Sequence, residues 1–233
     1  MKKPFLRSSK WETEKSKNER SITIVYIPKA FEVGDPARIV EFIKNNSFGI
    51  LFSCADGKPF ATHLPFFIDE TKDNHGVLMS HMAKQNPQWE NLNNSEVLVV
   101  FPCPHAYISP TWYNEPNTVP TWNYVAVHVY GTFQLIEDKE MMKHLLEKTV
   151  DFYESSMPTP WKVEFDDFIE HLMEGTVCFK INIQKIEGKW KLSQNHSIQR
   201  QKNLIKGLKT VDHYHSKEIA ALMEQNISQE EER

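Results

Sequence analysis

The sequence is poor in cysteine and glycine and has no long apolar run, and each shortage excludes a class of protein. Its 233 residues include three cysteines, which lie far apart without a CxxC pair, so neither a disulfide framework nor a zinc site is expected. The eight glycines form no Walker loop or dinucleotide fingerprint. No run of about 18 apolar residues or hydrophobic signal core is present. We therefore expect a protein of the reducing cytoplasm without a membrane partner.

An excess of positive charge is also lacking. The chain has 27 basic and 31 acidic residues and a net charge of −4, which argues against a protein that coats nucleic acid, although a local basic face could still bind DNA. Residues 1–24 differ from the rest, because they carry seven Lys or Arg against three Glu with almost no apolar periodicity. This composition predicts a disordered basic extension, with a phosphate-binding arm as the alternative.

What the chain does contain is a series of strand-like segments rich in Val, Ile, Phe and Tyr. Asp56-Gly57, between the first two, predicts a tight hairpin turn, and the strands are expected to form an antiparallel meander. Helices are predicted after Asp35-Pro36, over 139–153 and over 165–173, so the fold class is mainly β with flanking helices (α+β). The predicted strands are 48–53, 60–68, 77–82, 97–101, 106–109, 121–133 and 176–186.

The stretch 101–133 combines aromatic rings with hydroxyls, amides and imidazoles, more polar groups than a plain core strand needs. Its last strand alternates, with valines at 125, 127 and 129 on one face. The other face is aromatic and polar, which predicts a subunit interface or the wall of a ligand pocket. That face carries Trp122, Tyr124, His128 and Tyr130.

Two further segments could carry chemistry. In 80–89, SHMAKQNPQW, a strand runs into a loop dense in hydrogen-bond donors, which could hold a phosphate or could be an ordinary polar turn. In 190–195, WKLSQN, the chain follows an expected Glu187-Gly188 turn and could close over a ligand or cap the barrel. The helical stripe of Met142, Leu145, Leu146 and Phe152 is interpreted as core.

Six motifs follow one another in order between residues 25 and 210. They are Tyr26-Ile27-Pro28-Lys29, Ala61-Thr62-His63-Leu64-Pro65, the segment SHMAKQNPQW, Tyr107-Ile108-Ser109-Pro110 with Trp112-Tyr113, Val119-Pro120-Thr121-Trp122-Asn123-Tyr124, and Lys191-Leu192-Ser193-Gln194-Asn195. Together they resemble the PaiB family of FMN-binding negative transcriptional regulators. The resemblance implies an FMN-binding split β-barrel related to pyridoxamine phosphate oxidase, usually a homodimer with FMN sites at the subunit interface. It also implies repression of sporulation and degradative-enzyme genes.

The resemblance also suggests where the cofactor binds. It implies phosphate contacts at Ser80, His81 and Lys84, with Asn86 fixing the loop. The main chain of Thr62, His63 and Leu64 is expected to face the flavin ring. Trp122, Asn123, Ser193 and Gln194 are expected to complete the pocket from the partner subunit. The implied domains are a split barrel over 25–195 and a C-terminal helical segment over 196–233.

Two positions depart from the family pattern, and two other functions are compatible with the sequence. His196 stands where the pattern predicts Arg, which removes a permanent charge, and Cys103 stands where it predicts Gly. No residue is a compelling catalytic acid or base, so an enzyme is not the first expectation, and a flavin-dependent oxidoreductase is the first alternative. A haem-binding split barrel is the second, since His63, His81, His105 and His128 could meet. The pair His213 and His215 is expected at the surface.

Regulation could act through DNA or through a regulatory protein partner. The segment 198–208 and its flank carry Arg200, Lys202, Lys206 and Lys209 without an acid, but no helix-turn-helix is evident. A basic helix of this kind is usually a solvated face. Direct DNA contact is therefore not predicted from this segment alone.

Overall fold

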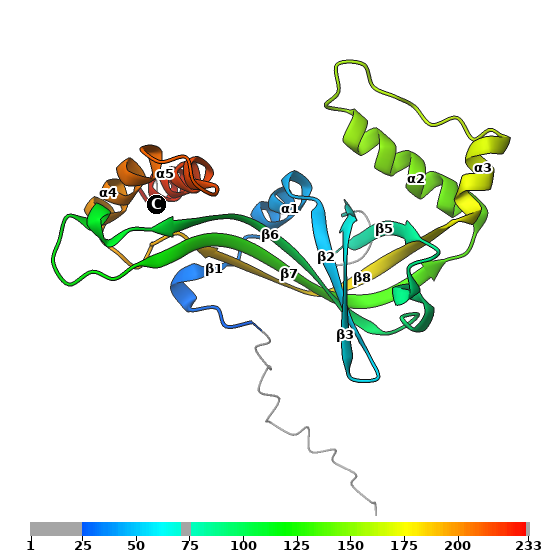
Figure 1. The fold of residues 1–233 in the computed structure, drawn as a ribbon, viewed down its shortest axis with the longest axis horizontal. Coiled ribbons are helices and arrows are strands. Elements are labelled where there is room, and N and C mark those ends of the chain that lie inside the picture. Colours follow the sequence, from blue (N-terminus) through cyan, green and yellow to red (C-terminus); the bar gives the residue numbers. More distant parts are fainter. Residues whose placement is uncertain (1–24, 71–75, 232–233) are drawn as a thin grey trace, which may run out of the picture.

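A computed structural model describes residues 25–70 and 76–231 and contains one strongly curled antiparallel sheet. The strand order is β3-β2-β6-β7-β8-β5-β4, and β1 pairs with β8 (Figure 1). The strands are β1 Glu32–Val33, β2 Phe48–Ala55, β3 Lys58–Pro65, β4 Phe67–Asp69, β5 Val77–Ala83, β6 Glu96–Ile108, β7 Thr121–Ile136 and β8 Thr176–Lys191. The helices are α1 Pro36–Asn45, α2 Lys139–Glu154, α3 Asp167–Glu174, α4 Ile198–Lys209 and α5 Ser216–Glu231, with short 3₁₀ turns η1 Lys29–Phe31, η2 Pro87–Asn91 and η3 Pro110–Tyr113.

The long strands β6, β7 and β8 form the meander that the sequence predicts, but β5 pairs on one side with its sequence neighbour β4 and on the other with the distant β8. Because the sheet curls, the two ends of the strand order approach each other. The Ser80 hydroxyl of β5 donates a hydrogen bond of 2.6 Å to the carbonyl oxygen of Pro65, at the end of β3. This bond ties the end of β3 to β5, the strand beside β4 at the other end of the order.

The hairpin signal is confirmed. Asp56 and Gly57 both have positive φ, +51° and +74°, between β2 and β3. A two-residue turn of this hand matches the right-handed twist of the strands, and glycine adopts it without steric cost. The turn fixes the register of β3, which forms one edge of the sheet.

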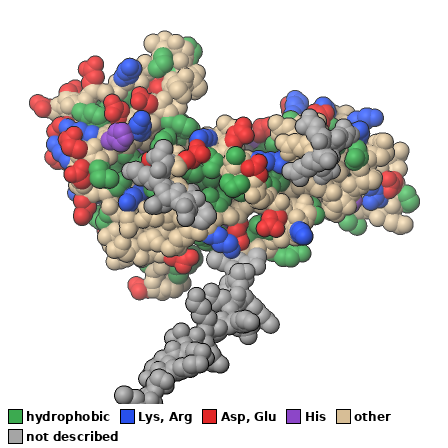
Figure 2. Space-filling model, turned by 180° about the vertical axis from the view of Figure 1, so that it is seen from behind, with side chains coloured by type: hydrophobic (Ala, Val, Ile, Leu, Met, Phe, Trp, Pro, Cys, Tyr) green, Lys and Arg blue, Asp and Glu red, His purple; other side chains and the backbone are tan. Residues whose placement is uncertain are grey.

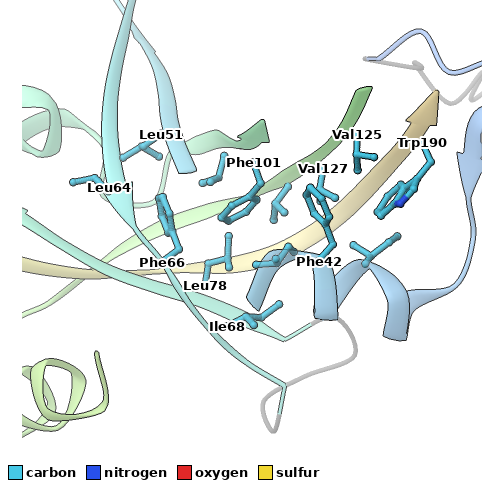
Figure 3. Packing of buried hydrophobic residues seen from close by; sticks show 14 of the residues in the cluster. Phe42, Leu51, Leu64, Phe66, Ile68, Leu78, Phe101, Val125, Val127 and Trp190 are labelled. Atoms are coloured by element: carbon cyan, nitrogen blue, oxygen red, sulfur yellow. The ribbon is translucent and has the colours of Figure 1, made fainter. Parts of the chain in front are cut away.

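The inner face of the sheet holds one continuous apolar core (Figure 3). Val125, Val127 and Val129 are buried there, as the alternation predicts. Trp190 is also buried, and Phe42 of α1 packs its ring edge-on against the indole at 5.2 Å. Helix α1 begins as predicted, with the Asp35 carboxylate accepting a hydrogen bond from the N–H of Ala37.

Helices α4 and α5 lie at one end of the sheet and α2 and α3 at the other, with α1 between them (Figure 1). Helices α4 and α5 join the main core through Leu204, Leu208, Ile219 and Met223. The predicted stripe of α2 is core, because Leu145 is buried in a second small cluster with Ile136 and Cys178 on the outer face of the sheet.

Three strand predictions are corrected. The predicted strands 97–101 and 106–109 are one strand, β6, whose pairing shifts between Pro102 and His105. Glu187-Gly188 is not a turn, because β8 runs on to Lys191 and pairs there with both β1 and β7. The predicted strand 60–68 divides into β3 and β4.

The boundary predicted after residue 195, between the barrel domain and the C-terminal helical segment, stays a prediction. Helices α4 and α5 of that segment share the core of the barrel. The predicted extension 1–24 lies outside the described residues. Among the described helices, none combines the length and apolar character needed to cross a bilayer.

Candidate functional site

The segment that the sequence singles out for phosphate binding begins in β5, where alternate side chains point to opposite faces of the sheet. Ser80 points inward, is 1% exposed, and donates its hydroxyl hydrogen to Pro65. His81 points to the outer face and is half-buried. Burial lowers the pKa of His81, and its buried Nδ1 has no hydrogen-bond partner among the described residues. A neutral imidazole with an open nitrogen therefore lies at the end of β5.

The loop after β5 is held firmly while one cation on it remains exposed. The backbone N–H of Lys84 donates to the carbonyl of Gly175 at 2.8 Å, and its carbonyl accepts from the indole N–H of Trp89 at 3.1 Å. The Lys84 side chain is exposed, and its ammonium makes no hydrogen bond or ion pair within the described ranges. A fixed main chain with an uncompensated ammonium suits an anion.

Asn86 joins this loop to β3. Its side-chain oxygen caps η2 by accepting from the N–H of Gln88, and its side-chain N–H donates to the Thr62 hydroxyl at 3.0 Å. The structure therefore brings together Thr62 and Asn86, two residues that the resemblance assigns to the flavin site. Because the asparagine is both a cap and a cross-link, it fixes the position of the loop relative to the strand.

Strand β3 presents an open edge to this loop. It ends the strand order, so one row of its backbone N–H and C=O groups is not used by a neighbouring strand. Thr62 is half-buried, His63 is exposed, and Leu64 is buried in the core. The His63 ring stacks on the exposed ring of Phe48 with centroids 6.2 Å apart. Open backbone groups beside exposed rings suit a flat ligand with hydrogen-bonding edges.

Gln88 is a functional candidate that the sequence interpretation missed. It is buried, and its side-chain N–H groups donate to the Leu51 carbonyl at 3.2 Å and the Ser53 hydroxyl at 3.1 Å. Its Oε1 has no partner in the part of the chain that the structure describes. The sequence offered one signal, the Asn86-Pro87 helix start, which places Gln88 in a first turn that packs back onto the sheet.

The remaining predicted residues lie in a second group. Asn123 is 1% exposed, and its amide exchanges hydrogen bonds of 3.0 and 3.1 Å with the hydroxyl of Ser193. Gln194 binds its own loop, since its side chain donates to the Trp190 carbonyl and accepts from the N–H of Leu192. Trp122 is 41% exposed and lies edge-on to Tyr107 and Tyr214. Among the described residues of one protomer, the second group therefore has its own contacts and no hydrogen bond to the loop at Lys84.

Asn123 and Ser193 also line a cavity of about 350 Å³. The cavity lies between the loop before β7, the end of β8 and the start of α4. Its other lining residues are Phe31, Tyr113, Asn117, Thr118, Val119, Thr121, Lys191, Asn195, His196 and Arg200. None of Thr62, His81, Lys84 and Asn86 belongs to it.

The outer face of the sheet carries the aromatic and polar positions of β7, as the alternation predicts. Val100, His128 and Glu187 lie side by side across β6, β7 and β8. Burial lowers the pKa of His128, and its Nδ1 lacks a hydrogen-bond partner within the described ranges. Tyr130 lies two residues further along β7, and burial together with the negative charge of Glu187 raises its pKa to about 12. The apolar half-buried side chains of Ile50, Phe52, Leu98 and Val100 continue this face toward β2.

The described histidines lie apart from one another, except for one pair. No group of three His, Cys, Asp or Glu side chains suited to a metal occurs in residues 25–70 and 76–231, so His63, His81, His105 and His128 do not converge there on a metal. His213 is exposed as predicted, but His215 is half-buried, with its ring 4.8 Å from that of His105.

Comparison with known proteins agrees with these features. Residues 25–185 match the family described as "Putative FMN-binding domain". The chain is 40% identical over 212 residues to the Bacillus subtilis "Protease synthase and sporulation protein PAI 2", covering 88% of this chain and 100% of that protein. The solved structure of an FAD and haem binding protein from Mycobacterium smegmatis has 14% identity and a TM-score of 0.54, over 69% of this chain and 73% of that one. The flavocytochrome Anf3 from Azotobacter vinelandii has 16% identity and a TM-score of 0.54, over 69% of each chain.

The matches confirm the split-barrel fold, the resemblance to the PaiB family and FMN as the cofactor. Because the identities to the two solved structures are so low, these structures support the fold of the chain and nothing beyond it. The family match spans most of the barrel, and the Bacillus relative is matched over its full length. The chain therefore belongs to the FMN-binding split-barrel family that includes PaiB.

Proposed function

We propose that this chain is a homodimeric FMN-binding repressor of protease-synthesis and sporulation genes. The observation that carries the proposal is its 40% identity to the full length of the Bacillus subtilis protein whose name links it to both processes. Fold likeness alone would not support a regulatory role, because one fold serves many functions.

The cofactor part of the proposal uses the first group of residues. The exposed ammonium of Lys84 binds the FMN phosphate, with the His81 imidazole as a second contact. The Thr62–Asn86 hydrogen bond holds the loop against β3, whose open edge hydrogen-bonds to the flavin ring. The open Nδ1 of His81 and the uncompensated ammonium fit this role, whereas the hydroxyl of Ser80 is already donated to Pro65. Bound FMN would supply one- or two-electron redox chemistry.

The dimer part rests on the outer face of the sheet. The buried Nδ1 of His128 would be left without a partner in a monomer, and such a group costs about 1–3 kcal/mol. The half-buried Ile50, Leu98 and Val100 add apolar surface beside it. A second copy covering this face would bury both, and would bring its exposed Trp122 toward the first copy's flavin.

The dimer can be tested by sedimentation of Val100→Arg, which places a charge in the centre of this face. We expect a dimer for the wild type and a monomer for the variant. The control, Met141→Arg, adds the same charge at an exposed position of α2 and should stay dimeric. A monomeric wild type, or a dimeric Val100→Arg variant, would show that the face is not the interface.

Regulation through a protein partner fits the charge distribution better than direct DNA contact. On α4, Arg200 pairs with Glu115 and Lys209 with Glu224, so these two cations are already compensated. Figure 2 shows Lys and Arg side chains interspersed with Asp and Glu over one face of the molecule. Sequence-independent DNA affinity needs several uncompensated cations together.

Replacement of the relative in Bacillus subtilis tests the regulatory role. In a strain without PAI 2, expression of this chain should lower secreted protease activity and the number of heat-resistant spores. Lys84→Ala should fail to do so if repression needs FMN, while Lys206→Ala, at an exposed position of α4, should behave as the wild type. Unchanged protease and spore numbers at matched protein levels would disprove the regulatory role.

A further inference from the structure

A second candidate ligand site is the cavity beside Lys191. At about 350 Å³ the cavity falls in the lower part of the range for small-molecule pockets. Its walls combine the apolar groups of Phe31, Tyr113 and Val119 with polar groups of β7, β8 and α4. The mouth is marked by Val119, whose side chain is 72% exposed although it is apolar.

Lys191 brings a half-buried positive charge to this cavity. Its ammonium donates to the Thr121 hydroxyl at 2.6 Å and to the Trp122 carbonyl at 2.5 Å. Both partners are neutral, and no carboxylate among the described residues pairs with it. Burial, and then the positive charge of Lys189, lower the pKa of Lys191. The third N–H of the ammonium is available to a ligand, and a negative charge there would offset the cost of burying the cation.

The other charged groups of the cavity nearly cancel. The Nε and Nη2 of Arg200 both contact one carboxylate oxygen of Glu115, at 2.7 and 2.6 Å. Burial and the neighbouring guanidinium lower the pKa of His196, which favours the neutral imidazole. The cavity therefore carries one net positive charge, that of Lys191. A single charge matches a monoanion better than a phosphate dianion.

Two neutral groups give the cavity a fixed shape. Ser193 has a φ of +66°, a left-handed conformation that is uncommon for serine. Its hydroxyl is held by the buried amide of Asn123, which also donates to the sulfur of Met223 on α5. A strained residue held by a buried amide at the cavity wall is typical of a preorganised site.

We propose that this cavity binds a small organic monocarboxylate, separately from FMN. The carboxylate would accept the free N–H of Lys191, and the apolar body would lie against Phe31, Tyr113 and Val119. The residues proposed to bind the FMN phosphate line no part of the cavity, so Asn123 and Ser193, which the resemblance assigns to the partner's side of the FMN pocket, here serve the second ligand instead. The proposal does not depend on the regulatory role, and it makes the chain a receptor for a second small molecule.

Calorimetric titration of FMN-loaded protein tests the proposal, with benzoate, phenylacetate and hexanoate as probes and benzamide as the uncharged analogue of benzoate. At least one acid should bind once per chain, without releasing FMN, while benzamide should not bind. Lys191→Met should weaken that binding by about 10-fold or more, because it removes a charge-assisted hydrogen bond but keeps the apolar stem. Lys206→Met is the matched control and should bind normally.

Val119→Trp provides a second variant, because it narrows the exposed mouth without touching the Lys191 hydrogen bonds and should also abolish binding. It carries the test if Lys191→Met does not fold. The proposal is overturned if none of the acids binds at about 10 mM, a weak-affinity limit. It is also overturned if benzamide binds as well as benzoate, if neither variant weakens binding, or if the acids displace FMN.

Discussion

Replacing Lys84 with Ala should weaken FMN binding without weakening the fold. The loop is held by main-chain bonds, from Lys84 N–H to Gly175 and from Trp89 to the Lys84 carbonyl, and these do not involve the ammonium. The side chain is exposed, so its truncation should change the free energy of unfolding by no more than about 0.5 kcal/mol. The variant therefore separates ligand binding from stability.

The size of the effect follows from the contact removed. A charge-assisted hydrogen bond contributes about 1.5–3 kcal/mol, and about 1.36 kcal/mol corresponds to a factor of ten. The Kd for FMN should therefore rise by about 10- to 150-fold in Lys84→Ala. Riboflavin lacks the phosphate, so its Kd should be the same for the wild type and the variant. The difference between the two flavins measures the phosphate contact alone.

Titrating each flavin with protein and following the quenching of flavin fluorescence supplies both constants. Lys206→Ala serves as the control, because it removes an exposed cation on α4, outside the proposed site. Equal losses of FMN and riboflavin affinity in Lys84→Ala would indicate general damage to the pocket. Unchanged FMN affinity would show that the phosphate does not bind at this lysine.

Two further predictions concern stability. Gly131→Ala should destabilise the fold by about 1–3 kcal/mol or more in urea unfolding, because the new Cβ would lie 2.4 Å from the backbone oxygen of Asn182. Gly34→Ala is the control, because open space surrounds Gly34. Equal stability of the two variants would contradict the close packing at Gly131. Burial lowers the pKa of His81 and His128, so the unfolded chain binds more protons as the pH falls through about 6.5, the usual pKa of histidine, and the free energy of unfolding should decrease. Replacing both histidines with Gln should flatten that slope, and an unchanged slope would show that other groups cause it.

Much of the fold could be predicted, because local signals and packing agree in most elements. Asp35-Pro36 starts a helix, Asp56-Gly57 forms the hairpin turn, and the valines of β7 face the core. The pairing of β5 with β8 could not be predicted, because the partners lie about 100 residues apart and neither strand carries a mark of the other. Gly188 was misinterpreted as a turn, although its missing Cβ makes room for Trp190 inside β8.

For the candidate site, the sequence indicates residues but not how they group in space. The contact between Thr62 and Asn86 agrees with the motifs that suggested a shared role. Ser80 illustrates the limit, because strand alternation alone does not say which face is buried, and the structure turns its hydroxyl inward. The hydrogen bonds between Asn123 and Ser193 join motifs 70 residues apart, and only the folded chain brings their cavity into view.

The most direct test of the central claim is a crystal structure of the protein with FMN bound. We expect the phosphate within about 3 Å of the Lys84 ammonium, and the flavin ring along the open edge of β3. A phosphate bound instead in the cavity of Lys191 and Arg200 would contradict both the proposed flavin site and the separate carboxylate site.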